Sequence, residues 1–386
     1  MIIAAGLSSS NRFIHVTGWF KNLAQNGFVV FLLIGLSTAV SGCSPFYVMR
    51  AAYEEGKILW RREPISEYLA RPELNQDTQE KLRLVLAVRD YARDALKLNV
   101  GGSYSSYSYV DTRDLTYIVM AAPKTELTPY TWWFLIVGRV PYKGFFSKED
   151  AEEELKRLQA DGYDTYMRTS AAFSTLGWFD DPLLGHLLRF DKVTLANVIF
   201  HELLHSTIYV NGAGAFNESL ANFVGHRAAI DFFRQRNGEE SPEYREAVRA
   251  WEQEKEFADF IKGIVATLQD LYQRDIPLRD KLRLREECFA RSKAEWLRRV
   301  SSGAAQGFRN FARQPLNNAV LIAYLIYLKK LPLFEQLYDA EGKSLARFVA
   351  VVREGVNGDQ EPFAVVQSLL DDKRRSAANE RPLESP

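Results

Sequence analysis

Residues 191–210 form the segment that most limits how this chain can fold. They are predicted to make a helix that is mostly apolar, yet the helix carries the sequence HELLH at residues 201–205. Positions four apart on a helix lie one above the other, so His201 and His205 can reach the same point in space. Histidines and a glutamate inside an apolar helix are costly to bury without a partner, and a metal ion supplies one. The fold is therefore expected to complete a metal site around this helix.

The residue types of this helix suit zinc. Neutral imidazole nitrogens bind Zn²⁺, which in catalytic sites takes three protein ligands and keeps one position for water. Glu202 points about 100° away from its histidine neighbour on the helix. It therefore faces the expected water, and it is the candidate base that would deprotonate a zinc-bound water.

A third ligand has to come from outside HELLH. The extended metzincin pattern would need a glycine at position 208 and a histidine at position 211, but the chain has Ile208 and Asn211 there. That class is excluded. Glu218 follows His205 within the sequence FNESLANF and is the first candidate.

The neighbourhood of Glu218 leaves alternatives open. Gly212 and Gly214 allow a sharp reversal between two helices, which would place Glu218 near the start of the returning helix. A carboxylate in that first turn can also serve only to complement the helix dipole. In that case His226 or Asp231, further along the same helix, would be the third ligand.

HELLH followed by FNESLANF resembles the gluzincin zinc peptidases, whose glutamate ligand sits in an Asn-Glu pair on the following helix. More narrowly, the chain is similar to a bacterial family of predicted aminopeptidases with a lipoprotein-type leader. The resemblance covers the chain from about residue 45 to residue 348. The matching blocks are WFLIVGRVPYKGFF (133–146), FSTLGWFDDPLL (173–184), VIFHELLHSTIYV (198–210) and FNESLANFVG (216–225).

This resemblance implies roles for four residues. His201, His205 and Glu218 would bind zinc, and Glu202 would be the catalytic base. One position departs from the expected family pattern, because Phe173 stands where a tyrosine is expected before Ser-Thr-Leu-Gly. Any chemistry performed by that phenol would be missing here.

The first 42 residues resemble a lipoprotein signal peptide. Residues 28–40 are strongly apolar and follow Arg12 and Lys21, as in a secretory signal. These 13 residues are shorter than the roughly 20 needed to span a bilayer, which argues against an uncleaved anchor. The sequence VSGC ends at Cys43 and resembles the lipobox, so Cys43 would become the lipidated N-terminus. Ser44 in place of aspartate favours the outer membrane, facing the periplasm.

The composition suits one large folded region and gives no sign of a nucleic-acid partner. Apolar residues make up 47% of the chain and aromatic residues 13%, which is enough for a core. The formal net charge is zero, whereas nucleic-acid binding needs a basic stripe. We expect a zinc metallopeptidase domain over residues 43–370. It could consist of two close-packed subdomains, 43–190 and 191–370, with a flexible polar tail at 371–386.

The periodicity of apolar residues predicts an α+β fold, with a small sheet and a dominant helical part of the zincin-like (gluzincin) kind. Strands are expected at 104–111, 115–121, 130–140 and 163–170. Helices are expected at 47–62, 67–97, 147–160, 182–190, 191–210, 216–236, 242–275, 279–300, 315–331 and 343–354.

Other polar residues are ambiguous. Asp180 and Asp181 could orient a zinc histidine or bind a substrate amine, or they could simply cap a following helix. Cys288 is expected to be a buried filler. A tetrahedral intermediate would also need an oxyanion partner, for which the candidates are Tyr142, Tyr209, Tyr324 and Tyr327.

These features favour a membrane-anchored zinc metallopeptidase that acts on peptides, an aminopeptidase by its family resemblance. An aminopeptidase needs an anionic pocket for a free amine, and the sequence shows no signature of one, so endopeptidase action remains open. One alternative is a non-catalytic or chaperone-like envelope lipoprotein built on a metallopeptidase fold. Another is a hydrolase with a non-peptide amide substrate.

Overall fold

The structure is a computed structural model that describes residue 53 and residues 56–109, 116–134, 138–170, 180–302 and 308–379. These residues all belong to one unit, Ala51–Pro386. The signal peptide, Cys43, Phe173 and the last seven residues of the expected tail lie outside the described residues. Within these ranges, no helix combines the length and the apolar character needed to cross a membrane.

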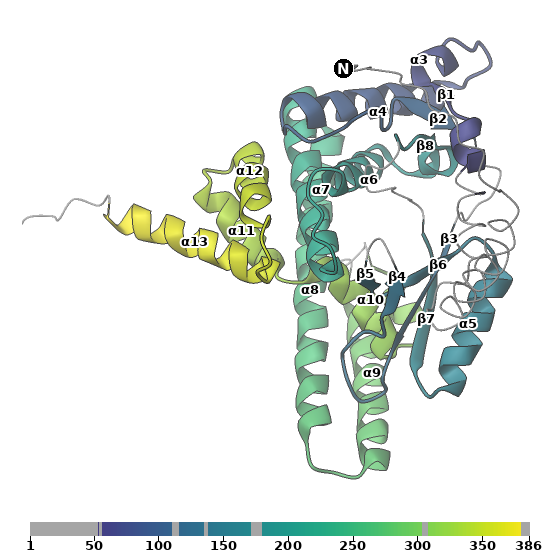
Figure 1. Ribbon diagram of the computed structural model, residues 1–386, viewed down its shortest axis with the longest axis vertical. Helices are drawn as coiled ribbons and strands as arrows, with labels where there is room; N and C mark the ends of the chain where they lie inside the picture. The colour runs from purple at the N-terminus through teal and green to yellow at the C-terminus, as the bar shows by residue number, and fades with distance from the viewer. Residues whose placement is uncertain are drawn as a thin grey trace, which may run out of the picture. The chain divides into compact units, whose positions relative to one another are not determined.

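The predicted α+β class is confirmed, because short strands accompany a majority of helices (Figure 1). The helices are α3 (Ile65–Tyr68), α4 (Gln76–Asp94), α5 (Lys148–Ala160), α6 (Lys192–His205), α7 (Gly214–Asn237), α8 (Pro242–Gln273), α9 (Leu278–Ser301), α10 (Asn318–Leu328), α11 (Leu331–Ala340), α12 (Leu345–Gly355) and α13 (Pro362–Asn379). The strands are β1 (Glu63–Pro64), β2 (Ser106–Ser108), β3 (Thr116–Ala122), β4 (Trp132–Phe134), β5 (Gly138–Val140), β6 (Lys143–Phe145), β7 (Asp164–Ser170) and β8 (Leu183–Leu184).

Strand β3 is the centre of an antiparallel sheet of order β6-β3-β7. Successive side chains of a strand point to opposite faces, and here both faces are covered by helices. Ile118 and Met120 pack in one cluster with Ala323 of α10. Val119 packs in another cluster with Leu158 of α5. The sheet is therefore sandwiched between α5 and α10, which explains why β3 is apolar along almost its whole length.

The segment predicted as one strand at 130–140 is instead a hairpin. Trp132 of β4 pairs with Val140 of β5 in antiparallel register. Gly138 adopts a φ of +72°, which glycine tolerates and residues with a Cβ rarely do. Apolar periodicity alone does not distinguish one long strand from two short ones that face each other, so the prediction was wrong in this detail.

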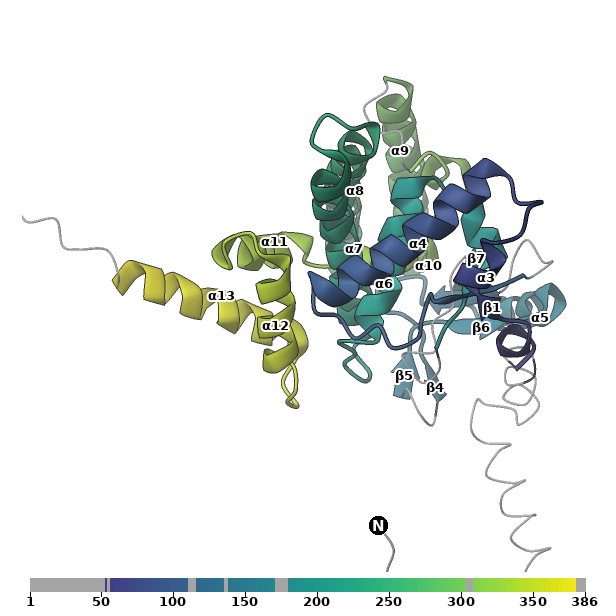
Figure 2. The same ribbon diagram turned by 90° about the horizontal axis from the view of Figure 1, so that it is seen from above.

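The helical part is built around α6 and α7, which are joined by a short loop and pack against each other. Helix α4 lies along α6, and α8 packs against α7 (Figure 2). The ring of Phe200 on α6 shows how these layers meet. It lies edge-on to the rings of Tyr91 on α4 and Phe232 on α7, with ring centres 5.9 Å and 6.0 Å apart. This packing buries the helix that carries HELLH, as its apolar character predicted.

Helices α11, α12 and α13 pack on one another, and α11 and α12 also contact α7. The ring of Phe216 on α7 packs against the rings of Phe334 on α11 and Phe363 on α13, with ring centres 6.0 Å and 5.2 Å apart. One hydrophobic core runs from Ile58 to Leu370, so it crosses the possible subdomain boundary at 190. Helix α13 continues to Asn379, into the stretch expected as a tail.

Two predicted helices differ strongly from the structure. Residues 67–97 were expected to form one helix, but Pro72 interrupts it and α4 begins only after the cap at Asn75, whose side chain accepts a hydrogen bond from the Thr78 amide at 2.8 Å. Residues 182–190 were expected to be helical. Instead, Leu183 and Leu184 form β8 beside β2, followed by a short 3₁₀ turn. At these residues, pairing of β8 with the distant strand β2 outweighed the local preference for a helix.

Candidate metal centre

The side-chain cap at the start of α6 fixes its beginning. Asp191 accepts hydrogen bonds from the backbone amides of Val193 and Thr194, each at 2.9 Å. The helix ends at His205, five residues before the predicted end. His201 and His205 therefore lie on its last turn, next to the loop that leads into α7.

The loop after α6 is fastened to α7 by Asn217. Its side chain accepts a hydrogen bond from the Val210 amide at 2.9 Å and donates one to the Val210 carbonyl at 2.8 Å. Gly212, between these residues, takes a φ of +75° that completes the reversal. Glu218 is the next residue, so the same contacts set the position of its backbone.

Helices α6 and α7 come unusually close at Gly225. A Cβ atom at this position would lie 3.0 Å from the backbone oxygen of Asn197, which precedes His201 by about one turn. Only a residue without a side chain fits there. The short distance between the helices brings Glu218 within reach of the histidines.

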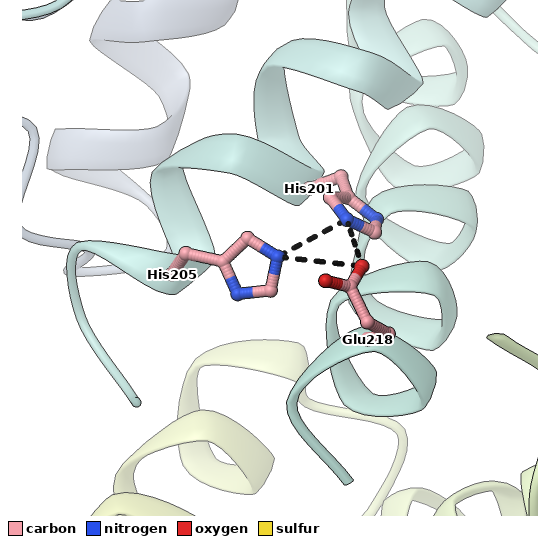
Figure 3. Close-up of side chains that lie close together, drawn as sticks. All are labelled: His201, His205 and Glu218. Atoms are coloured by element: carbon pink, nitrogen blue, oxygen red, sulfur yellow. Dashed lines mark hydrogen bonds and ion pairs between the residues drawn. The ribbon is translucent and has the colours of Figure 1, made fainter. Parts of the chain in front are cut away.

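The side chains of His201, His205 and Glu218 point toward one another (Figure 3). The two histidine Nε2 atoms lie 3.2 Å apart. The nearer carboxylate oxygen, Oε2 of Glu218, lies 3.3 Å from Nε2 of His201 and 3.8 Å from Nε2 of His205. Ligand atoms about 2.0–2.1 Å from a tetrahedral zinc ion lie about 3.3–3.4 Å from one another. Two of the three separations are close to this value and the third, 3.8 Å, is longer, so the three atoms are near enough to share one metal ion.

The two alternative ligands do not join this cluster. His226 has its Nε2 atom 3.7 Å from a carboxylate oxygen of Glu254 on α8. Asp231 pairs with Arg234 at 3.1 Å. Among the three candidates for the third ligand, the structure brings only Glu218 to the histidines.

The charge state of Glu218 suits a ligand. Burial favours a higher pKa for its carboxyl group, but hydrogen bonds with His201 and His205 outweigh burial and hold the pKa well below its usual value. The Tyr142 hydroxyl donates to the other carboxylate oxygen at 3.3 Å. Burial, together with the nearby Glu218 charge, raises the pKa of Tyr142, so this phenol stays a donor. Glu218 is thus an oriented anion.

Glu202 lies close enough to both histidines for their charges to affect its pKa. Burial is the largest influence and raises the pKa of its carboxyl group, although His201 and His205 lower it. A carboxylate with a raised pKa is a stronger base than an ordinary glutamate, which suits a proton acceptor beside the three converging ligands.

Asp180 and Asp181 do not cap a helix, because β8 follows them. The Asp180 side chain accepts a hydrogen bond from the Gly102 amide at 2.6 Å, and the Asp181 carbonyl accepts one from the Tyr104 amide at 2.7 Å. Both residues tie the loop before β2 to the segment that leads into β8. The side chain of Asp181 is buried, and its charge also raises the pKa of Glu202.

The four candidate tyrosines differ in their position. Tyr142 contacts Glu218, as described. The ring centre of Tyr327 lies 6.1 Å from that of His201. The hydroxyl oxygen of Tyr327 accepts a hydrogen bond from Arg168 at 2.8 Å. The Tyr209 ring lies 6.4 Å from the His205 ring. Tyr324 instead accepts a hydrogen bond from Gln314 at 3.2 Å and packs against Phe257.

Three polar residues near this site were not among the sequence predictions: Arg168 of β7, Asn222 of α7 and Glu254 of α8. Asn222 follows Glu218 by four residues and His226 follows Asn222 by four, so the helical period places all three on one face of α7. That polar stripe on an otherwise buried helix is the signal that could have revealed Asn222.

Comparison with known proteins gives one match. The profile of a protein family described as "Putative aminopeptidase" matches residues 46–361. No curated protein and no solved structure matches the chain. The matched range includes every residue of the candidate metal centre.

Proposed function

The chain belongs to this aminopeptidase family, and from that membership and the convergence of His201, His205 and Glu218 we propose that it is a zinc-dependent aminopeptidase. The convergence of the three ligand atoms carries the proposal, because two of their separations, 3.2 and 3.3 Å, are close to those around a tetrahedral zinc ion. When bound, Zn²⁺ would polarise the substrate carbonyl and make a water molecule more acidic.

Glu202 would accept the proton of the attacking water and then pass it to the leaving amine. Burial supports this role, since it raises the pKa of the carboxyl group towards the range of a base that acts at neutral pH. Tyr327 would donate a hydrogen bond to the oxyanion, because its hydroxyl oxygen is already oriented by the guanidinium of Arg168. Tyr142 would hold the carboxylate of Glu218 in place.

We also propose that the protein is held at the bacterial envelope through lipid on Cys43. The apolar stretch, the small residues before the cysteine and the absence of a long apolar run support this proposal. The substrates would then be peptides in the periplasm.

The experiment that tests the proposed chemistry compares the parent protein with Glu202→Gln. We expect the parent to bind about one zinc ion per chain and to hydrolyse members of a peptide library. The variant should keep the zinc and lose turnover by roughly 10²–10⁴-fold, the usual contribution of a general base. Glu153→Gln on the exposed side of α5 is the matched control and should behave as the parent.

A Glu202→Gln variant that turns over as fast as the parent would contradict the catalytic assignment. His201→Ala should lose the metal, and removal of zinc by a chelator should abolish activity that added zinc restores. Zinc binding by a parent that hydrolyses no peptide would point instead to the non-catalytic envelope protein.

A further inference from the structure

A cavity of about 280 Å³ is lined by two residues that also lie near the candidate metal centre. Tyr327 is one of them, and the centre of its ring lies 6.1 Å from that of His201. Asn222 also lines the cavity and follows the ligand Glu218 by one turn of α7. The remaining wall comes from β7, α8, α10 and the segment before α10, through Tyr166, Arg168, Glu254, Phe308, Ala323, Tyr324 and Leu328.

Glu254 places a carboxylate in the cavity wall. Its side chain is only 13% exposed. One of its oxygens accepts a hydrogen bond from Asn222 at 2.9 Å, and the other lies 3.7 Å from Nε2 of His226. Burial lowers the pKa of His226 to about 3, so that ring is neutral at physiological pH. Within the described part of the chain, no lysine or arginine forms an ion pair with Glu254.

The cavity is also lined by a cationic side chain, that of Arg168, which is directed to Tyr327 and forms no ion pair with Glu254. Arg168 donates to the Tyr327 hydroxyl oxygen at 2.8 Å, and its guanidinium carbon lies 5.6 Å from the centre of that ring. A buried carboxylate that lacks a cation is costly, and burial raises the pKa of Glu254 to about 7 as a result. A bound cation would remove that cost.

We propose that Glu254 binds the free α-amino group of a peptide, so that the cavity holds the N-terminal residue of the substrate. This inference rests on the proposed function and names the residue that would bind the N-terminus of the substrate. An ammonium group supplies the missing charge, and Asn222 keeps the receiving carboxylate in position.

The helical repeat of α7 brings the two groups to neighbouring turns. Glu218 and Asn222 are one turn apart, which is about 6 Å along the helix axis. Asn222 in turn donates a hydrogen bond to Glu254 at 2.9 Å. The amino nitrogen and the carbonyl carbon of one residue are about 2.5 Å apart, and a charge-assisted hydrogen bond adds about 2.8 Å. The span of one terminal residue is thus comparable with the axial step from Glu218 to the residue that holds Glu254.

The size and lining of the cavity favour a single residue. Its volume of about 280 Å³ lies just below the roughly 300–1,000 Å³ of pockets that hold drug-sized molecules. Tyr166, Phe308 and Tyr324 provide aromatic surface for an apolar or aromatic side chain. An acetylated N-terminus would leave the carboxylate unpaired, so the site should reject it.

The test uses the purified protein loaded with zinc and two sets of fluorogenic aminoacyl-coumarin amides, one with free amino groups and one N-acetylated. We expect the parent to prefer the free amines at least tenfold in kcat/KM. Glu254→Gln, which keeps an acceptor for Asn222, should lower kcat/KM for the free amines roughly 10–100-fold, mainly through KM. Its zinc content and its activity on the acetylated set should not change.

Glu256→Gln is the matched control, because it makes the same change on the same helix at a residue that pairs with Arg299 outside the cavity. It should keep the parental preference. Glu254→Asp retains the charge and should recover part of the lost preference. A Glu254→Gln variant that still prefers free amines would overturn this inference and leave the proposed aminopeptidase standing. A parent that cleaves both sets equally would overturn this inference and the preference for a free N-terminus, and would leave only the zinc-dependent hydrolysis standing. A parent that cleaves neither set would overturn both.

Discussion

Asn217 binds both backbone groups of Val210, accepting from its amide at 2.9 Å and donating to its carbonyl at 2.8 Å. The Asn217 side chain is 2% exposed, so water does not compete for these bonds. Because Glu218 is the next residue, the pair aligns the first turn of α7 with the histidines of α6.

We therefore expect Asn217→Ala to weaken zinc binding roughly 10–100-fold, the usual effect of removing a group that orients a ligand. Competition with a chelator of known affinity measures this change. Asn237→Ala, at the exposed end of the same helix, removes only a bond to Glu243 and is the control. Equal zinc affinity in both variants would show that Asn217 does not position the ligand.

Gly225→Ala should destabilise the protein, because its methyl group would meet the backbone of Asn197. We expect a loss of about 1–3 kcal/mol, typical of overpacking, together with weaker zinc binding as the helices separate. Gly263→Ala on α8 is the control, since a Cβ there meets no atom within 4 Å. That variant should gain up to about 1 kcal/mol from helix propensity. Urea unfolding measures the free energy of unfolding of both variants against that of the parent. A Gly225→Ala variant as stable as the parent would contradict the close approach of the two helices.

Glu254→Gln should stabilise the metal-free protein at alkaline pH. Burial raises the pKa of Glu254 from 4.5 to about 7. The unfolded chain releases this proton near pH 4.5 and the folded chain near pH 7, so the parent loses stability as pH rises between these values. Above pH 7 the variant should be more stable by on the order of 3 kcal/mol, whereas near pH 4 the two should agree. A difference that does not change with pH would refute the buried, unpaired carboxylate.

Cys43→Ala should change where the protein is found. If Cys43 carries the lipid, the parent will fractionate with membranes, and the variant will be soluble in the periplasm or retain its leader. Labelling with a radioactive fatty acid checks the same point directly. Membrane association and labelling that survive the substitution would rule out this anchor.

Local features of the chain were predictable from its sequence. The helix at 147–160 is predicted from a serine cap at Ser147 and acidic residues in the first turn, which depend only on neighbouring residues, and the structure confirms both in α5. The meeting of His201 and His205 follows in the same way from the helical repeat. Contacts between distant segments were not predictable on these grounds, which is why β8 and the β4–β5 hairpin were missed.

Glu254 illustrates the limit most clearly. Helix α8 carries acidic residues along its length, and nothing in their spacing distinguishes Glu254 from its neighbours Glu252 and Glu256. Its importance comes from burial against α7, where Asn222 and His226 meet it. The proposed pocket for an amino group is assembled from separate elements, so no single stretch of the sequence reveals it.

The α6–α7 pair supplies all three proposed ligands from residues 201–218, whereas most of the neighbouring cavity is contributed by β7, α8 and α10. Mutations in those outer elements can alter which terminal residue is accepted without disturbing the reactive centre. Related proteins can therefore differ in substrate preference while they keep the same metal centre.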